Sequence, residues 1–281
     1  MFNQNIKSPV NIPVSKIHPF EGNPYKVLDN DEMNILIGSI QEQGILTPII
    51  IRPIENTDEY EVISGHRRLH ATVKAGMKEV PAFIYAVTRD EAAIMLVDSN
   101  LHREHILPSE KAFAYKLKLE AMKHQGITCG QVGHKSRDEI SDTDSGRQIQ
   151  RYIRLTYLIP ELLDLVDEEK IALTPAVELS YLTDEEQYAL LGSIEVEDRT
   201  PSLSQAVRFK KLSQTGNLSD DDIETIMQED KANQKPMFKV SMEKLQEIAP
   251  RVKDKDFEDF VLKACEHYYR YLLRQRDRDS R

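Results

Sequence analysis

The hydrophobic and polar positions of the first hundred residues switch between the rhythm of helices and the rhythm of strands. In DNDEMNILIGSIQEQG (29–44), apolar residues recur every three or four positions, and Asn30 and Gly44 stand where a helix would begin and end. The pattern predicts a compact α+β domain over residues 1–105. Its other expected elements are strands at 48–52, 60–64 and 80–87 and helices near 66–75 and 90–100.

After Pro108 the strand pattern almost disappears. The stretch PSEKAFAYKLKLEAMKHQG (108–126) starts with proline and serine, ends at a glycine and carries an apolar stripe, so it predicts a helix of about four turns. An all-helical domain is therefore expected over residues 106–213. Its shorter helices are expected at 136–143, 145–155, 160–169, 175–181, 184–191 and 202–212.

The last part of the chain changes character twice. Residues 214–236 are polar and charged, and they predict a linker that carries a marginal helix. In the helical segment 237–281, apolar and aromatic residues then follow the a/d rhythm of a helix that packs along a partner. A helix that docks on its own domain would show the same pattern, so a dimer seam is one of two alternatives. The residues of this stripe are Phe257, Val261, Ala264, Tyr268 and Tyr271.

Composition and charge exclude several classes of protein. No run of about 18 apolar residues occurs, and the N-terminus lacks the layout of a secretion signal, so we expect no membrane association and a cytoplasmic location. The two cysteines, Cys129 and Cys265, indicate neither a disulfide framework nor a zinc site. The net charge of −10 repels nucleic acid on average, so DNA binding needs a local patch. Residues 106–160, with nine Lys and Arg against six Asp and Glu, provide one.

Positive charge is concentrated at a predicted turn, in ISGHRRLHA (63–71). Gly65 gives the backbone freedom between a strand and a helix, and the next N–H groups lie at the positive end of that helix. Arg67 and Arg68 add charged donors, so the turn suits a phosphate group. Paired arginines in a first helical turn also occur as members of surface ion pairs, and this alternative stays open.

The segment SGRQIQRYIRL (145–155) has the pattern of a DNA recognition helix. Its apolar residues fall on one side, and its three arginines fall on the opposite side with no acid among them. An ordinary surface helix would carry mixed charges, whereas Arg and Gln suit base edges in the major groove. The residues expected to contact DNA, with two in the preceding segment as phosphate contacts, are Lys135, Arg137, Ser145, Arg147, Gln148, Gln150, Arg151 and Arg154.

Two further stretches complete a set of three motifs. GILTPIIIR (44–52) precedes the GHRR turn and DSNLHREHILPSEKA (98–112) follows it. Together they resemble the nucleotide-binding boxes of the ParB family of DNA partition proteins, whose patterns are roughly G-x-x-x-P-I-x-V-R, G-E-R-R and E-N-x-x-R. The resemblance covers about residues 10–190.

The resemblance implies a ParB/sulfiredoxin-like N-terminal fold that binds CTP with Mg²⁺, followed by a helix-turn-helix domain. It also implies double-stranded DNA with a centromere-like site as the ligand, and a homodimer that the nucleotide closes into a sliding clamp. The activity expected from it is plasmid, phage or chromosome partition on the bacterial nucleoid, with a ParA-type Walker ATPase as a further partner.

The family's binding residues can be carried over by position. Gly44, Pro48 and Arg52 would line the nucleotide pocket, and the four residues Gly65, His66, Arg67 and Arg68 would cradle the phosphates. Asn100 would hold the metal, and Arg103 would bind the triphosphate.

Two positions depart from the family pattern, because His66 and Ser99 each stand where the boxes have glutamate. A hydroxyl group cannot replace a carboxylate in binding Mg²⁺ or in orienting an attacking water. We therefore expect CTP binding with slow or absent hydrolysis, and no catalytic residue is assigned.

Two other classes of function share parts of this framework. A sulfiredoxin-type redox enzyme has the same N-terminal fold, but it requires a cysteine beside the phosphate-binding turn, and SGHRR contains none. A ParB-like transcriptional regulator or nuclease of a mobile element would keep all three motifs without a role in partition. The sequence does not separate this second alternative from a partition protein.

Overall fold

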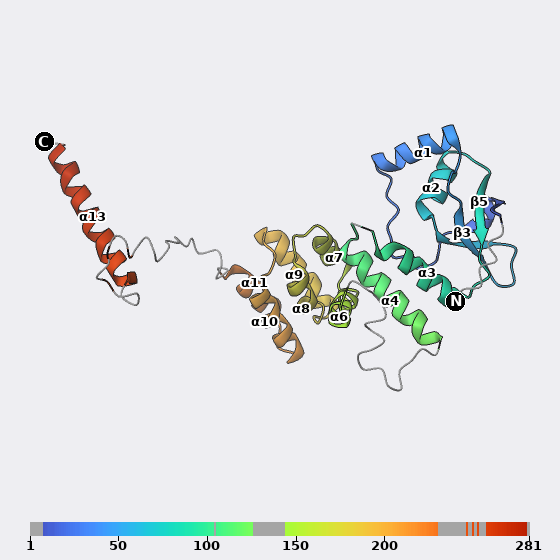
Figure 1. Ribbon diagram of the computed structural model, residues 1–281. Coiled ribbons are helices and arrows are strands. Elements are labelled where there is room, and N and C mark those ends of the chain that lie inside the picture. The colour runs from blue at the N-terminus through green and yellow to red at the C-terminus, as the bar shows by residue number, and fades with distance from the viewer. Residues whose placement is uncertain are drawn as a thin grey trace. The chain divides into compact units, whose positions relative to one another are not determined.

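A computed structural model describes residues 8–103, 105–125, 144–229 and 257–279, together with Gln246, Ala249 and Val252 (Figure 1). The chain divides into two compact units, Met1–Glu229 and Asp230–Arg281. Within the described residues, the helices are too short or too polar to cross a lipid bilayer. The predicted first helix at 136–143, with Lys135 and Arg137 beside it, lies outside the described residues.

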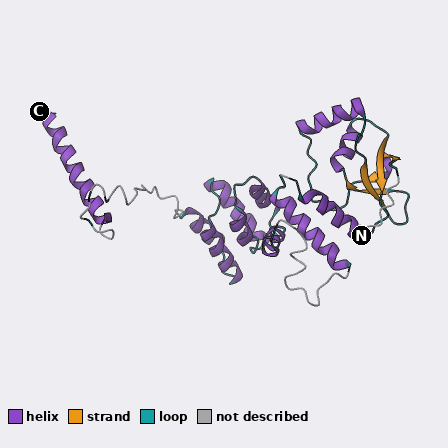
Figure 2. Cartoon of the chain, in the orientation of Figure 1, coloured by secondary structure: helices purple, strands orange, loops and turns teal. Residues whose placement is uncertain are grey.

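The N-terminal part of the first unit contains a five-stranded mixed sheet, orange in Figure 2, with the strand order β1-β5-β3-β4-β2. β3 pairs with β4 in the antiparallel and with β5 in the parallel sense. The α+β fold is thus confirmed for this part of the chain. The elements are β1 (Val10–Pro13), η1 (Val14–Lys16), β2 (Ile17–His18), α1 (Asp31–Gln43), β3 (Ile49–Pro53), β4 (Tyr60–Ser64), α2 (His66–Lys74), β5 (Glu79–Ile84) and α3 (Arg89–Leu101).

The sheet is covered on both faces, as the alternation of side chains along β4 shows. Val62 packs with Leu69 of α2 and with the other strands, whereas its neighbour Ile63 packs with Leu96 of α3. Successive residues of a strand point to opposite faces, so Val62 and Ile63 of β4 are buried on the two opposite faces of the sheet. The turn after β4 and the end of α3 are thereby fixed relative to each other.

The local signals that end and begin helices act as the sequence predicts. The Asn30 side chain accepts a hydrogen bond from the Met33 backbone N at 3.1 Å and caps α1. Gly44 ends α1 with φ of 71°, a left-handed conformation that favours glycine. Thr183 and Glu186 form a capping box at the start of α9.

The remainder of the first unit is helical, and its core is built from leucines and other large apolar side chains such as Leu155, Leu162, Leu190 and Phe209, all fully buried. Gln187 is also buried in this core, where its Oε1 accepts from the Ile159 backbone N at 2.8 Å. The helices are α4 (Pro108–His124), α6 (Gly146–Leu155), α7 (Pro160–Asp167), α8 (Leu173–Leu179), α9 (Asp184–Glu197), α10 (Leu203–Gln214) and α11 (Asp220–Gln228).

The two predicted domains of this unit share an apolar contact. Ala92 and Leu96 of α3 lie in one buried cluster with Ala114 and Ala121 of α4. Small residues on both helices allow a close approach of their backbones, and the contact continues the core of the sheet domain into the helical domain. The boundary near residue 105 is therefore a packed junction of two domains.

Helix α11 corrects the predicted linker at 214–236. Ile223, Ile226 and Met227 are buried in the helical core, and Gln205 Nε2 donates to the Ile226 carbonyl at 2.6 Å. Acidic residues dominate the composition of this stretch. The three apolar residues nevertheless recur at helical spacing, and this spacing lets them pack together into the core. Residues 214–229 thus belong to the helical domain.

The second unit contains helix α13 (Phe257–Asp279). At the start of its predicted stripe, Phe257 is buried and its ring meets that of Phe260 edge-on, at 6.4 Å between centroids. Further along, Tyr268 and Tyr271 stack on each other but remain 60% and 49% exposed. Part of the aromatic stripe is therefore open to solvent in the single chain.

Candidate nucleotide and DNA sites

A small polar pocket forms where three separate segments of the first unit meet. The segments are the loop after β2, the turn from β4 into α2 and the end of α3. Two of the three predicted boxes, GHRR and its partner at the end of α3, therefore converge on one pocket. Its lining residues are Asn23, Tyr25, Lys26, Val27, Gly65, His66, Arg67, Asn100 and Arg103.

The turn into α2 requires glycine for two reasons. Gly65 has φ of 102°, and a Cβ atom placed there would lie 2.8 Å from Ile49 Cγ2. As the N-cap of α2, Gly65 has no side chain that could accept hydrogen bonds from the first N–H groups of the helix. These groups and the positive end of the helix dipole are therefore available to an anion in the pocket.

His66 is a neutral residue of this pocket. Its Nε2 accepts a hydrogen bond from the Phe20 backbone N at 3.2 Å. The pKa of His66 is lowered to about 4, chiefly by burial and also by the positive charge of Arg103, while the carboxylate of Glu61 acts in the opposite direction. At neutral pH, His66 therefore adds no charge to the pocket.

Each cation of the pocket has a partner in the protein. Arg67 Nη2 lies 3.0 Å from Glu32 Oε2 of α1, and both side chains are largely exposed. Lys26 Nζ lies 3.4 Å from Asp167 Oδ2 of α7. The Arg103 guanidinium lies over the Tyr25 ring, 5.5 Å from its centroid. Because exposed ion pairs are weak in water, a bound anion could replace Glu32 as the partner of Arg67.

Residues of the first motif, GILTPIIIR (44–52), do not line the pocket but make contacts within the sheet domain. The Arg52 guanidinium makes two 2.8 Å contacts with Glu61 Oε2, and both side chains are buried. Arg68 Nη1 donates to the carbonyl oxygens of Thr47 and Pro48, the latter at 2.7 Å. Gly44, Pro48, Arg52 and Arg68 are thus not among the residues that line the pocket, and their contacts to a nucleotide stay a prediction. Arg52 pairs with a buried carboxylate, and Arg68 donates to two carbonyl oxygens just before β3.

The end of α3 presents an amide to the pocket. Asn100 is buried, and its Nδ2 donates to the Leu96 carbonyl at 2.7 Å, which leaves Oδ1 as a possible ligand for a cation. The Ser99 hydroxyl is turned back onto the same carbonyl at 3.0 Å. Among the described residues that line the pocket, none carries a carboxylate.

The sequence reasoning missed the loop after β2 and the acid that pairs with Arg52. The Asn23 side chain bonds both the backbone N and the carbonyl of Tyr25 at 3.2 Å, an Asn-Pro turn that could be recognised from the sequence. The position of this loop beside α2 could not be recognised from the sequence. Glu61 was detectable, since a lone acid in the apolar strand YEVIS pairs in register with Arg52.

Helix α6 has the two faces that its sequence predicts. Ile149 is fully buried against Tyr115 and Met122 of α4. Ser145 caps the helix by accepting a hydrogen bond from the Gln148 backbone N at 3.3 Å. Arg147 is exposed and Gln150 half-buried. The anchoring face of a candidate recognition helix is therefore in place.

The three arginines of α6 differ in their surroundings. Arg151 donates to Thr174 Oγ1 of α8 at 2.6 Å and to Gln148 Oε1 at 3.3 Å. Arg154 lies between the rings of Tyr157 and Tyr181, at 4.4 and 3.9 Å from their centroids. It also donates to the Ser180 carbonyl at 2.6 Å. Arg154 is thus engaged within the protein, and its predicted contact with DNA stays a prediction.

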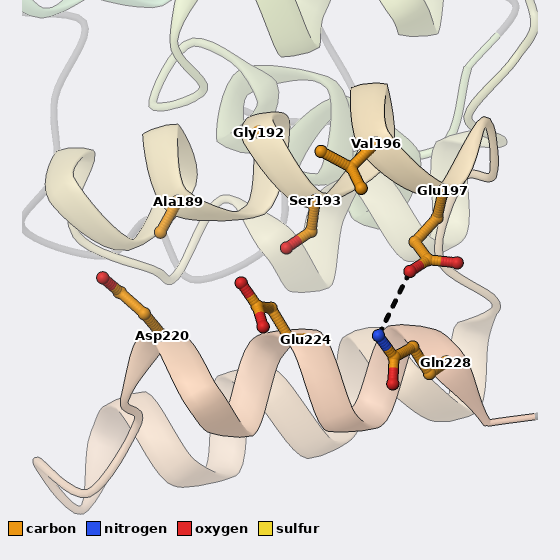
Figure 3. Close-up of a pocket in the computed structure, with 8 residues that line it drawn as sticks. All are labelled: Ala189, Gly192, Ser193, Val196, Glu197, Asp220, Glu224 and Gln228. Carbon is orange, nitrogen blue, oxygen red and sulfur yellow. Dashed lines mark hydrogen bonds between the residues drawn. The ribbon is translucent and has the colours of Figure 1, made fainter.

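A larger hollow lies between α9 and α11 (Figure 3). Gln228 Nε2 donates to Glu197 Oε1 across it at 3.3 Å. Its described lining residues include three acids and no Lys or Arg, so the hollow repels anionic ligands such as nucleotides and DNA. The residues that line it are Ala189, Gly192, Ser193, Val196, Glu197, Asp220, Glu224 and Gln228.

Comparison with solved structures finds weak global likenesses. The C-terminally truncated chromosome-partitioning protein ParB from Caulobacter crescentus, complexed to the centromeric parS site, has 19% identity and a TM-score of 0.41, covering 78% of this chain and 98% of that chain. The form complexed with CTP-gamma-S has 22% identity and a TM-score of 0.33, covering 67% and 99%. With TM-scores below 0.5, these likenesses do not bear on the site.

Comparison with known sequences is more informative. Residues 3–101 match the model of the ParB N-terminal domain. The chromosome-partitioning protein Spo0J of Thermus thermophilus is 33% identical over 162 residues, which are 58% of this chain and 56% of the relative. A nucleoid occlusion protein of Listeria monocytogenes is 33% identical over 131 residues, 47% of this chain and 45% of the relative. The chain spans about half the length of these curated relatives. Residues 3–101 thus match the ParB N-terminal domain, and the chain is similar to these two relatives over about half of its length.

Proposed function

We propose that the protein is a nucleotide-regulated, sequence-specific DNA-binding protein that acts in plasmid, phage or chromosome partition. The observation that carries the proposal is the convergence of the GHRR turn with Asn100 and Arg103 on one cationic pocket. Helix α6, which carries the arginines suited to DNA, lies in the same compact unit. The match of residues 3–101 to the ParB N-terminal domain adds the expectation that the nucleotide is CTP.

The pocket provides the groups that a triphosphate needs. Lys26, Arg67 and Arg103 supply three positive charges, and the first turn of α2 supplies N–H donors. Mg²⁺ is commonly held by few protein ligands and by phosphate oxygens, so Asn100 Oδ1 can serve as its protein ligand here. The part of the chain described here offers no cluster of three acids, histidines or cysteines for a metal, so the nucleotide would provide most of the coordination.

Hydrolysis of the nucleotide is expected to be slow or absent. The Ser99 hydroxyl donates to its own helix, and His66 uses Nε2 to accept from Phe20. Neither residue presents a base to an attacking water, and the described pocket residues add no carboxylate. A phosphate-release assay with CTP and DNA should give turnover near background, and robust DNA-stimulated release would contradict this part of the proposal.

DNA contact is assigned to the exposed side of α6. Arg147, Gln150 and Arg151 would reach base edges, with Gln148 and the capping Ser145 near the backbone. Lys135 and Arg137, from the segment before this helix, would contact phosphates. Arg154 would support the helix through its contacts with the rings of Tyr157 and Tyr181.

The assembly is proposed from α13. Its exposed, stacked Tyr268 and Tyr271 continue an a/d stripe, which suits a second copy of the helix. A homodimer formed in this way could be closed by nucleotide into a clamp around DNA, with a ParA-type ATPase as a partner on the nucleoid. Analytical ultracentrifugation of the chain with Tyr268→Glu tests this, since a dimer seam predicts dissociation.

A second candidate is a role in nucleoid occlusion without partition. The observation in its favour is that nucleoid occlusion relatives are as similar as the Spo0J relative, at 33% identity. Mapping the DNA sites that the protein occupies in cells separates the two functions. A cluster of sites near one locus supports partition, and sites spread around the chromosome support occlusion.

The proposal is tested by calorimetric titration with ATP, GTP, CTP and UTP, in the presence and absence of DNA from the protein's own locus. Selective binding of CTP and of one DNA fragment is expected. Failure of all four nucleotides would contradict the nucleotide site, and failure to prefer any fragment would contradict sequence-specific DNA binding.

A further inference from the structure

Lys26 belongs both to the nucleotide pocket and to a contact between the two domains of the first unit. It lies in the loop after β2, among the residues that line the pocket. Its Nζ is 3.4 Å from Asp167 Oδ2 and 3.5 Å from Asp164 Oδ1, and both acids are on α7 of the helical domain. Its backbone N also donates to Glu110 Oε1 of α4 at 2.9 Å.

In this contact, Asp167 is held in place more firmly than Lys26. Asp167 is only 8% exposed and accepts from both the backbone N and the hydroxyl of Ser109, at 2.9 and 2.5 Å. Lys26 is 47% exposed, and its ammonium group stands on a flexible four-carbon stem. Lys26 is thus the partner that can change its contact while Asp167 stays in place.

The other cations of the pocket do not share this arrangement. Arg67 pairs with Glu32 of α1, and Arg103 lies over Tyr25, so both partners belong to the sheet domain or to the pocket itself. Among the cations that line the described pocket, Lys26 alone is paired with carboxylates of the helical domain. A ligand that attracts Lys26 therefore acts on the contact between the domains.

We propose that Lys26 binds nucleotide phosphates in competition with Asp164 and Asp167, so that a polyphosphate in the pocket releases the loop after β2 from α7. The inference rests on the nucleotide site proposed above and adds a regulatory residue to it. A triphosphate concentrates several negative charges at one place, whereas Asp164 is 64% exposed and strongly screened by water.

Competition of this kind has a reciprocal consequence. If phosphate binding weakens the contact of Lys26 with α7, then weakening that contact must strengthen phosphate binding by the same factor. The expected factor is small, about two- to fivefold in affinity, because partly exposed ion pairs are weak. Its sign is informative, since removing an acid that merely held the fold together would not improve binding.

The experiment uses the full chain and two probes, CTP and inorganic triphosphate, in calorimetric titrations. Asp164→Asn removes one competing charge without disturbing the bonds between Asp167 and Ser109. Glu161→Gln is the control, because it removes one exposed charge from the same helix at a position one turn before Asp164, whereas Lys26 pairs with Asp164 and Asp167. Lys26→Met, alone and with Asp164→Asn, shows whether any effect passes through the lysine.

We expect Asp164→Asn to bind both probes about two- to fivefold more tightly than wild type and Glu161→Gln to bind them nearly as wild type does. Lys26→Met should weaken both probes and abolish the gain from Asp164→Asn. Equal affinities for Asp164→Asn and Glu161→Gln, or a gain that persists with Lys26→Met, would overturn the inference. Wild-type protein that binds neither probe would instead contradict the proposed nucleotide site.

Discussion

Two ion pairs of the sheet domain differ in burial. Each joins an arginine of a predicted nucleotide-binding box to a glutamate. Arg52 and Glu61 are 7% and 6% exposed on neighbouring strands. Arg67 and Glu32 are 42% and 71% exposed at the rim of the pocket. A buried arginine whose acid is also buried is bound to the fold, whereas an exposed pair can exchange its partner for a ligand. The burial of an ion pair therefore distinguishes arginines that stabilise the fold from arginines that are available to a ligand.

The largest effect should come from breaking the buried pair. Arg52→Ala leaves the Glu61 carboxylate buried without its cation, which should lower the free energy of unfolding by about 3–5 kcal/mol. Urea unfolding measures it. The double variant Arg52→Met with Glu61→Met should recover much of the loss, since it removes both charges. A loss below about 1 kcal/mol for Arg52→Ala would show that the pair is not structural.

The pH dependence of stability should reveal the neutral, buried His66. Its pKa is about 4 in the folded protein and about 6.5 when unfolded, so the unfolded state binds more protons between these values. The contribution of His66 to the free energy of unfolding is fully present above pH 6.5. It is lost as the pH drops toward 4, by up to about 3 kcal/mol. Unfolding of His66→Gln over the same pH range should show a smaller slope. An unchanged slope would contradict the assignment of His66 as a neutral acceptor.

The arginines of α6 extend the comparison to DNA. Arg147→Ala and Arg151→Ala should each weaken binding to a cognate duplex by about 1–3 kcal/mol and reduce its preference over a random duplex. Arg154→Ala should lower thermal stability, because this arginine stacks on two tyrosines and bonds Ser180. Fluorescence anisotropy with both duplexes makes the measurement. Equal losses on the two duplexes would make Arg147 and Arg151 phosphate contacts.

The smallest effect should come from the exposed pair. Glu32→Gln removes the partner of Arg67 and should change the free energy of unfolding by no more than about 1 kcal/mol. The matched substitution in the buried pair, Glu61→Gln, should cost clearly more. Similar losses for the two glutamines, in parallel urea titrations, would remove the basis for separating the pairs by burial.

Features that depend on a few adjacent residues could be predicted from the sequence. Asn30 and Ser145 cap their helices, and Gly44 ends α1, because each acts on its own turn. The helix at α11 was taken for part of a linker, since its three buried residues are recognisable only when the core that receives them is known. Local chemistry predicted the elements, and tertiary packing decided which of them form the core.

The candidate site divides along the same line. The GHRR turn and the end of α3 could be assigned to one pocket from their motifs. The roles of Arg52, Arg68 and Arg154 could not be assigned from the sequence. An arginine that binds a ligand looks the same in sequence as one that bonds a carbonyl or a buried acid. The loop that contributes Lys26 carries a turn signal but nothing that places it beside α2.

The central claim is that the exposed cations of the pocket bind a nucleotide triphosphate. Calorimetric titration of CTP into Arg67→Ala and Arg103→Ala tests it most directly, with Arg89→Ala as the control, since Arg89 is an exposed arginine of the same domain paired with Glu21 outside the pocket. The account predicts a loss of about tenfold or more in affinity for the two pocket variants and wild-type affinity for Arg89→Ala. Equal affinity in all three variants would contradict it.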